Sequence, residues 1–309
     1  MKKDKFLSVI IVTHNNQQII KNTLNKLTIS LDALNKPWEI IVVDNASSDK
    51  TIEVVKENSR RYSRDPDPKA SGKKLTLIQS NQNRGYAWAN NRGIEKSQGK
   101  YILLLNSDVV LNEDSLKKTI DFLDKDPNVG VVTCKILLQN GKIDPACHRG
   151  FPTPWVSLTY MIGLEKLFPN IRLFSGYHMW YKDINKTHEI DSCSGAFYLF
   201  RREIIEKVGL LDEKFFMYGE DLDFSYRIKN HGYKIIYYPY CFAVHLKYQS
   251  GLKSTDRETQ KRTIEAFYQA MIIFYQKNYS NKYPFFVTGL IIFMIGLIKN
   301  LKLLISRFW

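Results

Sequence analysis

Short apolar runs and longer amphipathic stretches alternate over the first third of the chain. The apolar runs are rich in β-branched residues and predict strands at 7–12, 39–43, 75–79 and 101–105. Helical periodicity predicts helices between them, at 18–31, 51–58 and 87–97. Near-continuous apolar strands joined by helices form a mostly parallel sheet flanked by helices on both faces. The pattern predicts a Rossmann-like α/β fold, which binds ligands beyond the carboxyl ends of its strands.

Polar residues follow three of these strands, where such a fold places its ligand. They are Thr13 and Asn15 after the first strand, Asp44 after the second, and Asn106, Ser107 and Asp108 after the fourth. Helix capping explains Ser and Asp residues such as those at 47–49, but not a carboxylate directly after a buried Ile-Ile-Val-Val run. Asp44 could accept hydrogen bonds from a nucleobase or a ribose. Asp108 could hold a hard divalent cation on substrate phosphates, since such a cation needs one or two carboxylates from the protein.

Two further segments carry candidate chemistry. Glycines around Arg84 permit close backbone approach, and Arg84 itself could pair with phosphate, although a surface or structural role explains it equally well. Glu220 and Asp221 start a helix predicted to reach about Lys229. Acidic residues favour a first helical turn, but paired carboxylates also suit general acid–base work. His245 follows a strand-like run, where a structural role and metal ligation are both open.

Less regular segments separate these motifs. Residues 59–74 are polar and contain proline and glycine, so we expect a surface loop. Residues 140–190 hold many aromatic residues and four prolines. We expect them to form an irregular cover, either near an acceptor site or through ordinary packing of aromatic residues.

Seven stretches in order resemble the family 2 inverting glycosyltransferases of GT-A fold, and most resemble their rhamnosyltransferase-like branch. They span residues 6–246, and although each is weakly specific, their ordered combination is highly specific. The stretches are Leu7-Ser-Val-Ile-Ile-Val-Thr-His-Asn, Ile41-Val-Val-Asp-Asn-Ala-Ser-Ser-Asp, Asn83-Arg-Gly-Tyr-Ala-Trp-Ala-Asn-Asn-Arg-Gly, Leu103-Leu-Leu-Asn-Ser-Asp, Ser194-Gly-Ala-Phe, Gly209-Leu-Leu-Asp-Glu-Lys-Phe-Phe-Met-Tyr-Gly-Glu-Asp-Leu-Asp and Val244-His245.

The resemblance implies a role for each matching residue. It places Thr13, Asn15, Asp44, Arg84, Asn106 and Ser107 around a nucleotide-sugar donor. It implies that Asp108, the last position of a D-x-D motif, and His245 hold Mg²⁺ or Mn²⁺. It implies that Asp221 is the general base and that Glu220 positions the acceptor hydroxyl. The first D-x-D position is Asn106, so only Asp108 brings charge from this motif.

The C-terminal part differs from the rest. A capping-box pattern at 255–258 and apolar residues at helical spacing predict a helix packed on the catalytic region. Residues 285–298 are uncharged, but 14 residues are fewer than the ~20 needed to span a membrane. Leu301, Leu304, Ile305 and Phe308 then share one helical face opposite lysines, and Trp309 ends the chain. This favours an interfacial helix over 284–309 on an anionic membrane, with a homo-oligomer contact as the alternative. We therefore expect a catalytic domain over 1–250 and a helical tail over 251–309.

Composition and charge narrow the function. The chain has 45 Lys and Arg against 31 Asp and Glu, a net charge of +14, and residues 247–309 carry half of that excess. This excess of positive charge indicates a polyanionic partner. Lys and Arg are dispersed through the catalytic region and do not form one basic patch, which argues against nucleic acid as that partner. The four cysteines form no C-x-x-C pair, which fits a reducing cytosol and a location on the inner face of the cell membrane.

The function that we expect is transfer of a sugar to a lipid-linked or polysaccharide acceptor in bacterial surface glycan synthesis. Resemblance favours dTDP-rhamnose as donor, ahead of a UDP-hexose. A basic nucleic-acid-binding protein or an inactive membrane-bound scaffold is the alternative of another class. The combined presence of five candidate site residues argues against the scaffold, because a protein without catalytic activity needs none of them. They are Asp44, Asp108, Glu220, Asp221 and His245.

Overall fold

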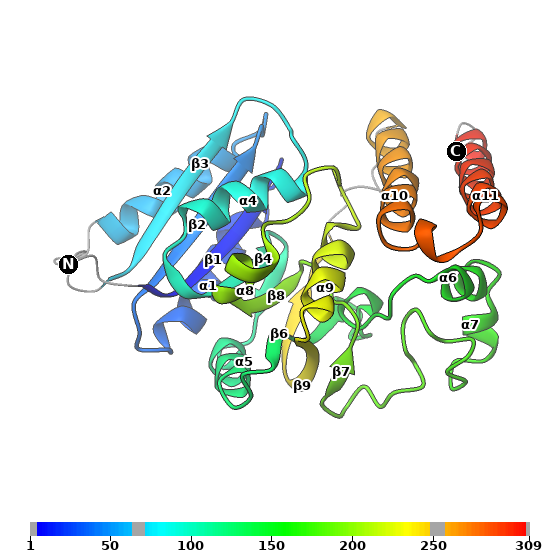
Figure 1. The fold of residues 1–309 in the computed structure, drawn as a ribbon. Helices are drawn as coiled ribbons and strands as arrows, with labels where there is room; N and C mark the ends of the chain where they lie inside the picture. The colour runs from blue at the N-terminus through cyan, green and yellow to red at the C-terminus, as the bar shows by residue number, and fades with distance from the viewer. Residues whose placement is uncertain (1–4, 64–71, 248–256, 307–309) are drawn as a thin grey trace.

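A nine-stranded mixed sheet forms the centre of the computed structural model, which describes residues 5–63, 72–247 and 257–306 (Figure 1). The strand order is β3-β2-β1-β4-β8-β6-β9-β5, and β7 pairs with β9. The predicted α/β fold with helices flanking the sheet is confirmed.

The first half of the sheet is parallel, as the apolar runs predict. Its strands are β1 (Lys5–Thr13), β2 (Trp38–Asn45), β3 (Lys74–Ser80) and β4 (Gly99–Asn106). Thr13 lies opposite Asp44, and Val12 lies opposite Asn106. The carboxyl ends of β1, β2 and β4 are therefore level with one another.

Helices cover both faces of β2, because its side chains alternate between them. The helices of this half are α1 (Ile20–Asp32), α2 (Thr51–Ser63) and α4 (Tyr86–Lys96). Ile41 and Val43 pack with Ala89 of α4, whereas Ile40 and Val42 belong to the cluster that contains Leu24 of α1. Full burial of β2 explains its continuous apolar sequence.

The second half of the sheet contains the antiparallel pairings. Its elements are β5 (Val109–Leu111), α5 (Ser115–Leu123), β6 (Val129–Leu138), β7 (His188–Ile190), β8 (Phe197–Arg201), α8 (Glu203–Val208), α9 (Glu220–Asn230) and β9 (Lys234–His245). Strand β8 runs antiparallel between β4 and β6. Short strand β5 pairs with the end of β9, so that Val109 lies opposite His245. That pairing brings the end of the chain's last strand beside Asp108.

An irregular segment connects β6 to β7, as expected for 140–190. It contains only η1 (Pro145–Cys147), α6 (Pro154–Met161) and α7 (Leu164–Leu167). The Gly150 amide donates to the Tyr177 carbonyl at 2.7 Å and closes the base of residues 150–177, which we name the excursion.

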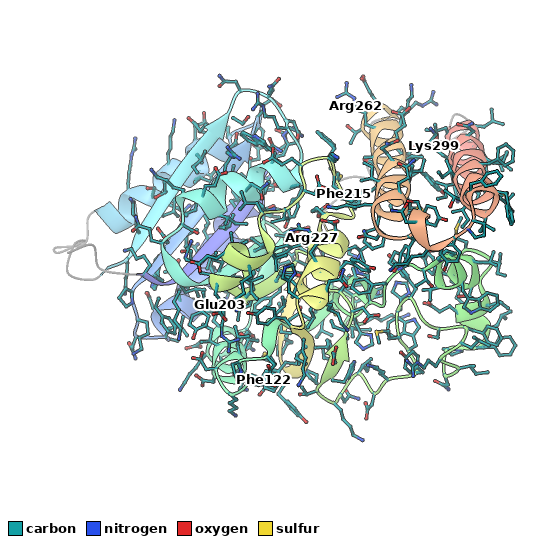
Figure 2. All side chains as sticks on the ribbon, in the orientation of Figure 1. Phe122, Glu203, Phe215, Arg227, Arg262 and Lys299 are labelled. Carbon is teal, nitrogen blue, oxygen red and sulfur yellow. The ribbon has the colours of Figure 1, made fainter. Side chains whose placement is uncertain are left out.

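Two antiparallel helices end the chain and pack on the catalytic region. They are α10 (Arg257–Asn278) and α11 (Phe285–Ile305), joined by η3 (Ser280–Lys282). Phe215 lies in the loop before α9 and packs with Ala270 and Phe274 of α10 (Figure 2). Lys277 of α10 pairs with Asp223 of α9 at 2.8 Å. The predicted packing of this helix on the catalytic region is confirmed.

The helix α11 is longer than the uncharged run that the sequence analysis used to judge it. It continues through Lys299 and Lys302 to Ile305, so its 21 residues are about 31 Å long. Among the described residues it is the one helix long and apolar enough to cross a membrane. The prediction that this segment is too short to span a membrane considered only residues 285–298 and was therefore wrong. Part of the 59–74 loop, Thr255 of the capping box, Phe308 and Trp309 lie outside the described residues.

Candidate active site

The ends of β1 and β2 are tied together by side chains that the sequence marked for nucleotide binding. Asp44 is fully buried and accepts from the Ser47 amide at 3.0 Å and the Ser47 hydroxyl at 2.5 Å. Asn15 has a positive φ of 54° and accepts from the Ser48 amide at 2.8 Å. In this structure Asp44 and Asn15 therefore shape the two strand-end loops themselves.

Asn16 joins the ends of β1 and β4, a role that sequence reasoning did not assign. Its Oδ1 accepts from the Thr13 hydroxyl, the His14 amide and the Ser107 hydroxyl, each at 3.0 Å. Thr13 and Ser107 thus meet at one amide oxygen. The signal available was the Thr-His-Asn-Asn run after the first strand.

Tyr86 connects the D-x-D motif to the loop before α9, since its amide donates to the Phe216 carbonyl at 2.8 Å. Its hydroxyl donates to Asn106 Oδ1 at 2.8 Å and lies 3.2 Å from the Gly195 carbonyl. A Cβ at Gly195 would approach that hydroxyl to 2.6 Å, so the glycine makes room for the tyrosine. Burial of the hydroxyl, and then the negative charges of Glu220, Asp221 and Asp108, raise the pKa of Tyr86. Asn106, at the first D-x-D position, therefore has Tyr86 as its hydrogen-bond partner. Sequence reasoning did not identify this role of Tyr86.

Asp108 and His245, the two residues predicted to hold a metal, are in direct contact with each other. His245 Nε2 lies 3.2 Å from Asp108 Oδ1, and His245 Nδ1 lies 2.7 Å from Asp144 Oδ2. Burial would lower the pKa of His245, but Asp108 and Asp144 outweigh it and raise the pKa to about 9. Asp144 is fully buried and pairs with Lys247 at 3.0 Å. Burial would raise the pKa of Asp144, but its contacts with His245 and Lys247 lower it to about 2.

These residues fit a divalent cation that substrate phosphates complete. The described residues contain no group of three or more His, Cys, Asp or Glu side chains arranged for a metal. Mg²⁺ commonly takes only one or two carboxylates from a protein and the rest from phosphates and water. A histidine that ligates through one nitrogen usually donates from the other to a carboxylate, as His245 can donate to Asp144.

Glu220 and Asp221 begin α9 directly after a turn that favours glycine. Gly219 has φ 82°, and a Cβ there would lie 3.2 Å from Ala270 Cβ of α10. Asp221 Oδ2 accepts from Arg149 Nη2 at 2.5 Å. Burial would lower the pKa of Arg149, but Asp221 outweighs it and raises that pKa, which keeps the guanidinium charged.

The neighbouring Glu220 has the opposite environment. Its Oε2 is buried and finds no hydrogen-bond partner within the described part of the chain. Burial, and then the charge of Asp221, raise the pKa of Glu220 well above its usual range. One carboxylate of the pair is therefore salt-bridged while the other favours its neutral form, a difference typical of acid–base sites.

Arg84 stands apart from these acids. It is exposed, and its guanidinium carbon lies 5.2 Å from the centre of the Trp88 ring. Its backbone amide donates to Asn45 Oδ1 at 3.0 Å, so Asn45 organises this glycine-containing loop. A donor phosphate contact for Arg84 stays a prediction.

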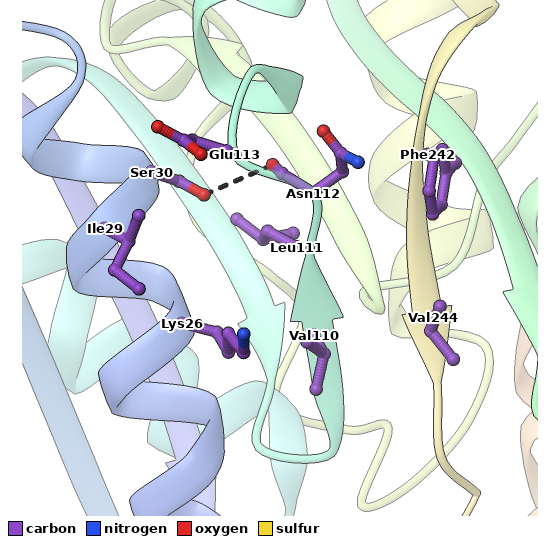
Figure 3. Close-up of a pocket in the computed structure, with 9 residues that line it drawn as sticks. All are labelled: Lys26, Ile29, Ser30, Val110, Leu111, Asn112, Glu113, Phe242 and Val244. Carbon is purple, nitrogen blue, oxygen red and sulfur yellow. Dashed lines mark hydrogen bonds between the residues drawn. The ribbon is translucent and has the colours of Figure 1, made fainter.

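A surface pocket of about 290 Å³ lies elsewhere, between α1, β5 and β9 (Figure 3). It contains none of the predicted site residues, and the Ser30 hydroxyl in it already donates to the Asn112 carbonyl at 3.2 Å. We therefore place the candidate site at the strand ends and at the start of α9.

Solved glycosyltransferases share this architecture. The mannosyltransferase PcManGT from Pyrobaculum calidifontis, solved with GDP-Man and Mn²⁺, superposes with a TM-score of 0.56 at 20% identity, over 87% of this chain and 64% of that one. TarS residues 1–349 from S. aureus gives 0.54 at 18% identity, with the same coverage. These likenesses show the fold and confirm the expected GT-A architecture.

Curated relatives are glycan-synthesis enzymes. The low-salt glycan biosynthesis hexosyltransferase Agl10 of Haloferax volcanii is 26% identical over 74% of this chain and 63% of its own length. A poly-beta-1,6-N-acetyl-D-glucosamine synthase of Staphylococcus epidermidis is 26% identical over 75% of this chain and 48% of its own. The chain thus spans between about half and just under two thirds of these relatives. The model of the family described as Glycosyl transferase family 2 matches residues 8–209, more than half of the chain, and the chain belongs to that family.

Proposed function

We propose that this protein is a metal-dependent inverting glycosyltransferase that moves a sugar from a nucleotide-diphosphate donor to a hydroxyl of a lipid-linked or polysaccharide acceptor. One observation carries the proposal. Tyr86 links the two parts of the site: its hydroxyl donates to Asn106, two residues before Asp108, at 2.8 Å, and its amide donates at 2.8 Å to the carbonyl of Phe216, in the loop that leads to α9. A metal-binding group and an acid–base group connected through one residue suit a reaction that joins a charged donor to a neutral acceptor.

The donor would lie over the carboxyl ends of β1, β2 and β4. Thr13, Asn15 and Asp44 would contact its base and ribose, with Arg84, Asn106 and Ser107 nearer the diphosphate. Asp108 and His245 would hold Mg²⁺ or Mn²⁺, with Asp144 orienting the imidazole. When bound, the cation would neutralise charge on the departing nucleotide diphosphate.

Asp221 would take the proton of the acceptor hydroxyl. Its carboxylate is held by Arg149, and Glu220 beside it is suited to hold the hydroxyl as a hydrogen-bond donor. Attack by that oxygen on the anomeric carbon, opposite the departing diphosphate, inverts the configuration there.

We infer that dTDP-rhamnose is the donor and that a UDP-hexose is the alternative. The first choice rests on the resemblance to the rhamnosyltransferase-like branch. The alternative is supported by a solved relative of similar fold, S. aureus TarS, which was captured with UDP-GlcNAc. Bacterial cell-surface glycan synthesis is the proposed setting.

We propose that residues 1–250 form the catalytic unit and that the tail, 251–309, holds it on the inner face of the cell membrane. One side of α11 packs on α10, where Ile295 meets Ile264 and Tyr268. Because α10 carries six charged residues and is itself docked on the catalytic region, α11 would stay with it at the interface and lay its free face on the bilayer. A homo-oligomer contact through that face is the alternative.

A donor panel tests the function. Release of nucleotide diphosphate is measured with dTDP-rhamnose, UDP-hexoses and GDP-mannose, with Mn²⁺ and a bacterial lipid extract as acceptor. We expect fastest turnover of dTDP-rhamnose and a product of inverted anomeric configuration. No release from any donor would favour the inactive scaffold, and retained configuration would exclude direct displacement.

A further inference from the structure

Exposed large apolar side chains are concentrated in two segments of the molecule. Within the described residues, all but four of them lie in the excursion or in residues 283–305; the exceptions are Ile29, Phe216, Tyr240 and Phe242. In the excursion they include Ile162 at 60% exposure and Leu167 at 70%. Scattered apolar residues need no explanation, but such a concentration marks an interaction surface.

The two segments lie at the same end of the molecule (Figure 1). Phe151, at the start of the excursion, packs in the same cluster as Ile291 and Ile292 of α11. Segments that are distant in sequence therefore contribute to one side of the protein. We name the exposed apolar residues of both segments the apolar end.

The excursion is held as a folded unit with its apolar side chains outward. The Thr153 hydroxyl caps α6 by accepting from the Val156 amide at 3.3 Å, and Trp155 Nε1 donates to the Leu173 carbonyl at 2.8 Å. The buried Glu165 of α7 pairs with His178 across the base. The outward face is thus a built feature of the fold.

The charges on this surface are positive. Residues 166–173 form an unbroken exposed run that contains Lys166 and Arg172. The only acid in the sequence between 151 and 182 is Glu165, which is turned inward. Residues 283–305 likewise contain Lys299 and Lys302 but no acid, and Figure 2 shows Lys299 at the same end of the helical pair as Arg262. Apolar side chains interspersed with cations match the interface of an anionic bilayer.

A hollow on the excursion also combines apolar side chains with a cation. It has a volume of about 440 Å³ and is lined by Trp155, Val156, Arg172 and Leu173. A guanidinium beside apolar walls suits the phosphate of a lipid headgroup together with the start of its chain.

We propose that the excursion enters the interfacial region of an anionic membrane beside α11, so that the protein docks through two elements. A symmetric contact between two copies of this face would bring together two surfaces that carry Lys166 and Arg172 but no exposed acid to pair with them, which disfavours self-association. The excursion begins directly after Arg149, the partner of Asp221. Docking of the excursion would hold Asp221, the proposed general base, next to the membrane that carries a lipid-linked acceptor. Only this last consequence rests on the proposed function.

A fluorophore on the excursion reports the contact in the full chain. Leu167→Cys is labelled with an environment-sensitive dye, because all four native cysteines are buried. Tyr240→Cys is the matched control, since Tyr240 is 58% exposed and lies outside the apolar end. With vesicles containing one third phosphatidylglycerol, we expect the label at 167 to shift to the blue, to be quenched by lipid-borne nitroxide and to be shielded from iodide. The label at 240 stays open to iodide.

Two outcomes would overturn the proposal. One is a protein that floats with the vesicles while the label at 167 remains open to iodide, which would leave α11 as the only anchor. The other is a blue shift of the label at 167 that grows with protein concentration in the absence of vesicles. That result would show that a second copy of the protein, and not a membrane, covers the apolar end.

Paired charge substitutions provide an independent test. Ile162→Glu with Leu167→Glu should weaken binding to the anionic vesicles by about tenfold or more, because two apolar side chains no longer leave water. Tyr240→Glu with Phe242→Glu should leave it unchanged, and circular dichroism checks folding of both. Equal binding by the two variants would contradict the proposal. Transfer to a soluble acceptor should be unaffected, so this result and the donor panel can fail separately.

Discussion

Arg149 Nη2 lies 2.5 Å from Asp221 Oδ2, with only 10% and 12% of the two side chains exposed. The second carboxylate oxygen, Oδ1, accepts from the Leu222 amide at 2.7 Å. Both oxygens are therefore fixed before any acceptor arrives. Arg149 directly precedes the excursion and Asp221 lies in the first turn of α9, so the pair connects the base of the proposed membrane contact to the proposed general base.

Asp221→Asn should abolish sugar transfer while leaving nucleotide binding intact. The amide keeps the shape of the side chain but cannot accept the acceptor proton, and such a loss typically costs about 10²–10⁴-fold in rate. Turnover is measured with the best donor of the panel, and nucleotide affinity by calorimetry. Asp183→Asn, on the surface, is the control, and near-normal turnover in the Asp221 variant would rule out the base assignment.

Arg149→Met should destabilise the fold, because it leaves the Asp221 carboxylate, which is only 12% exposed, without its partner. Breaking a buried ion pair from one side costs about 3–5 kcal/mol in free energy of unfolding. Urea denaturation measures the change. The double variant Arg149→Met with Asp221→Leu should recover much of it, whereas a single variant within about 1 kcal/mol of the parent would show that the pair behaves as an exposed one.

Glu220→Gln should stabilise the protein increasingly as the pH rises. The pKa of Glu220 is raised in the folded state, so its contribution to stability is complete below the ordinary value of 4.5 and is lost as pH rises toward the folded value. Glutamine has no such loss. The Tm of the variant minus that of the parent should grow by at least about 2 °C from about pH 5 upward and then level off. Glu258→Gln, an exposed partner of Arg262, should show no trend, and a flat difference for Glu220→Gln would contradict its burial as an acid.

Asp144→Asn should weaken Mn²⁺ binding in the presence of a nucleotide diphosphate by about 10–100-fold, the usual cost of losing a partner that orients a ligand histidine. Calorimetry or the Mn²⁺ resonance signal measures it. Lys247→Met removes the other partner of Asp144 and spares His245, so its affinity should stay near that of the parent. Equal losses in both variants would assign the effect to local charge rather than to orientation of His245.

The sequence was sufficient for the first half of the fold and for the residues at its strand ends. Parallel strands buried on both faces leave continuous apolar runs, and the chemistry follows each run directly, as Asp44 and Asp108 do. The register that places Thr13 opposite Asp44 then brings the predicted residues together. The antiparallel insertion of β8 could not be predicted, because pairing between distant strands leaves no local pattern.

The supporting residues of the site were missed for the same reason. Asp144 lies 101 positions from His245, and Arg149 lies 72 positions from Asp221, in a segment with no regular periodicity. Tyr86 was visible only as an aromatic residue after Gly85, and its hydrogen bond to Asn106 depends on how α4 packs on the sheet. Sequence therefore marked the groups that would touch substrate and left unmarked those that hold them.

Nucleotide binding with and without Mn²⁺ tests the central claim most directly, because it needs no knowledge of the acceptor. Calorimetry is run with dTDP and UDP on the parent protein, on Asp108→Ala and on the control Asp114→Asn, whose side chain is about half exposed. We predict Mn²⁺-dependent binding of a nucleotide diphosphate by the parent and the control, and its loss in Asp108→Ala. Binding that is independent of Mn²⁺ and equal in all three proteins, or absent from all three, would contradict the account.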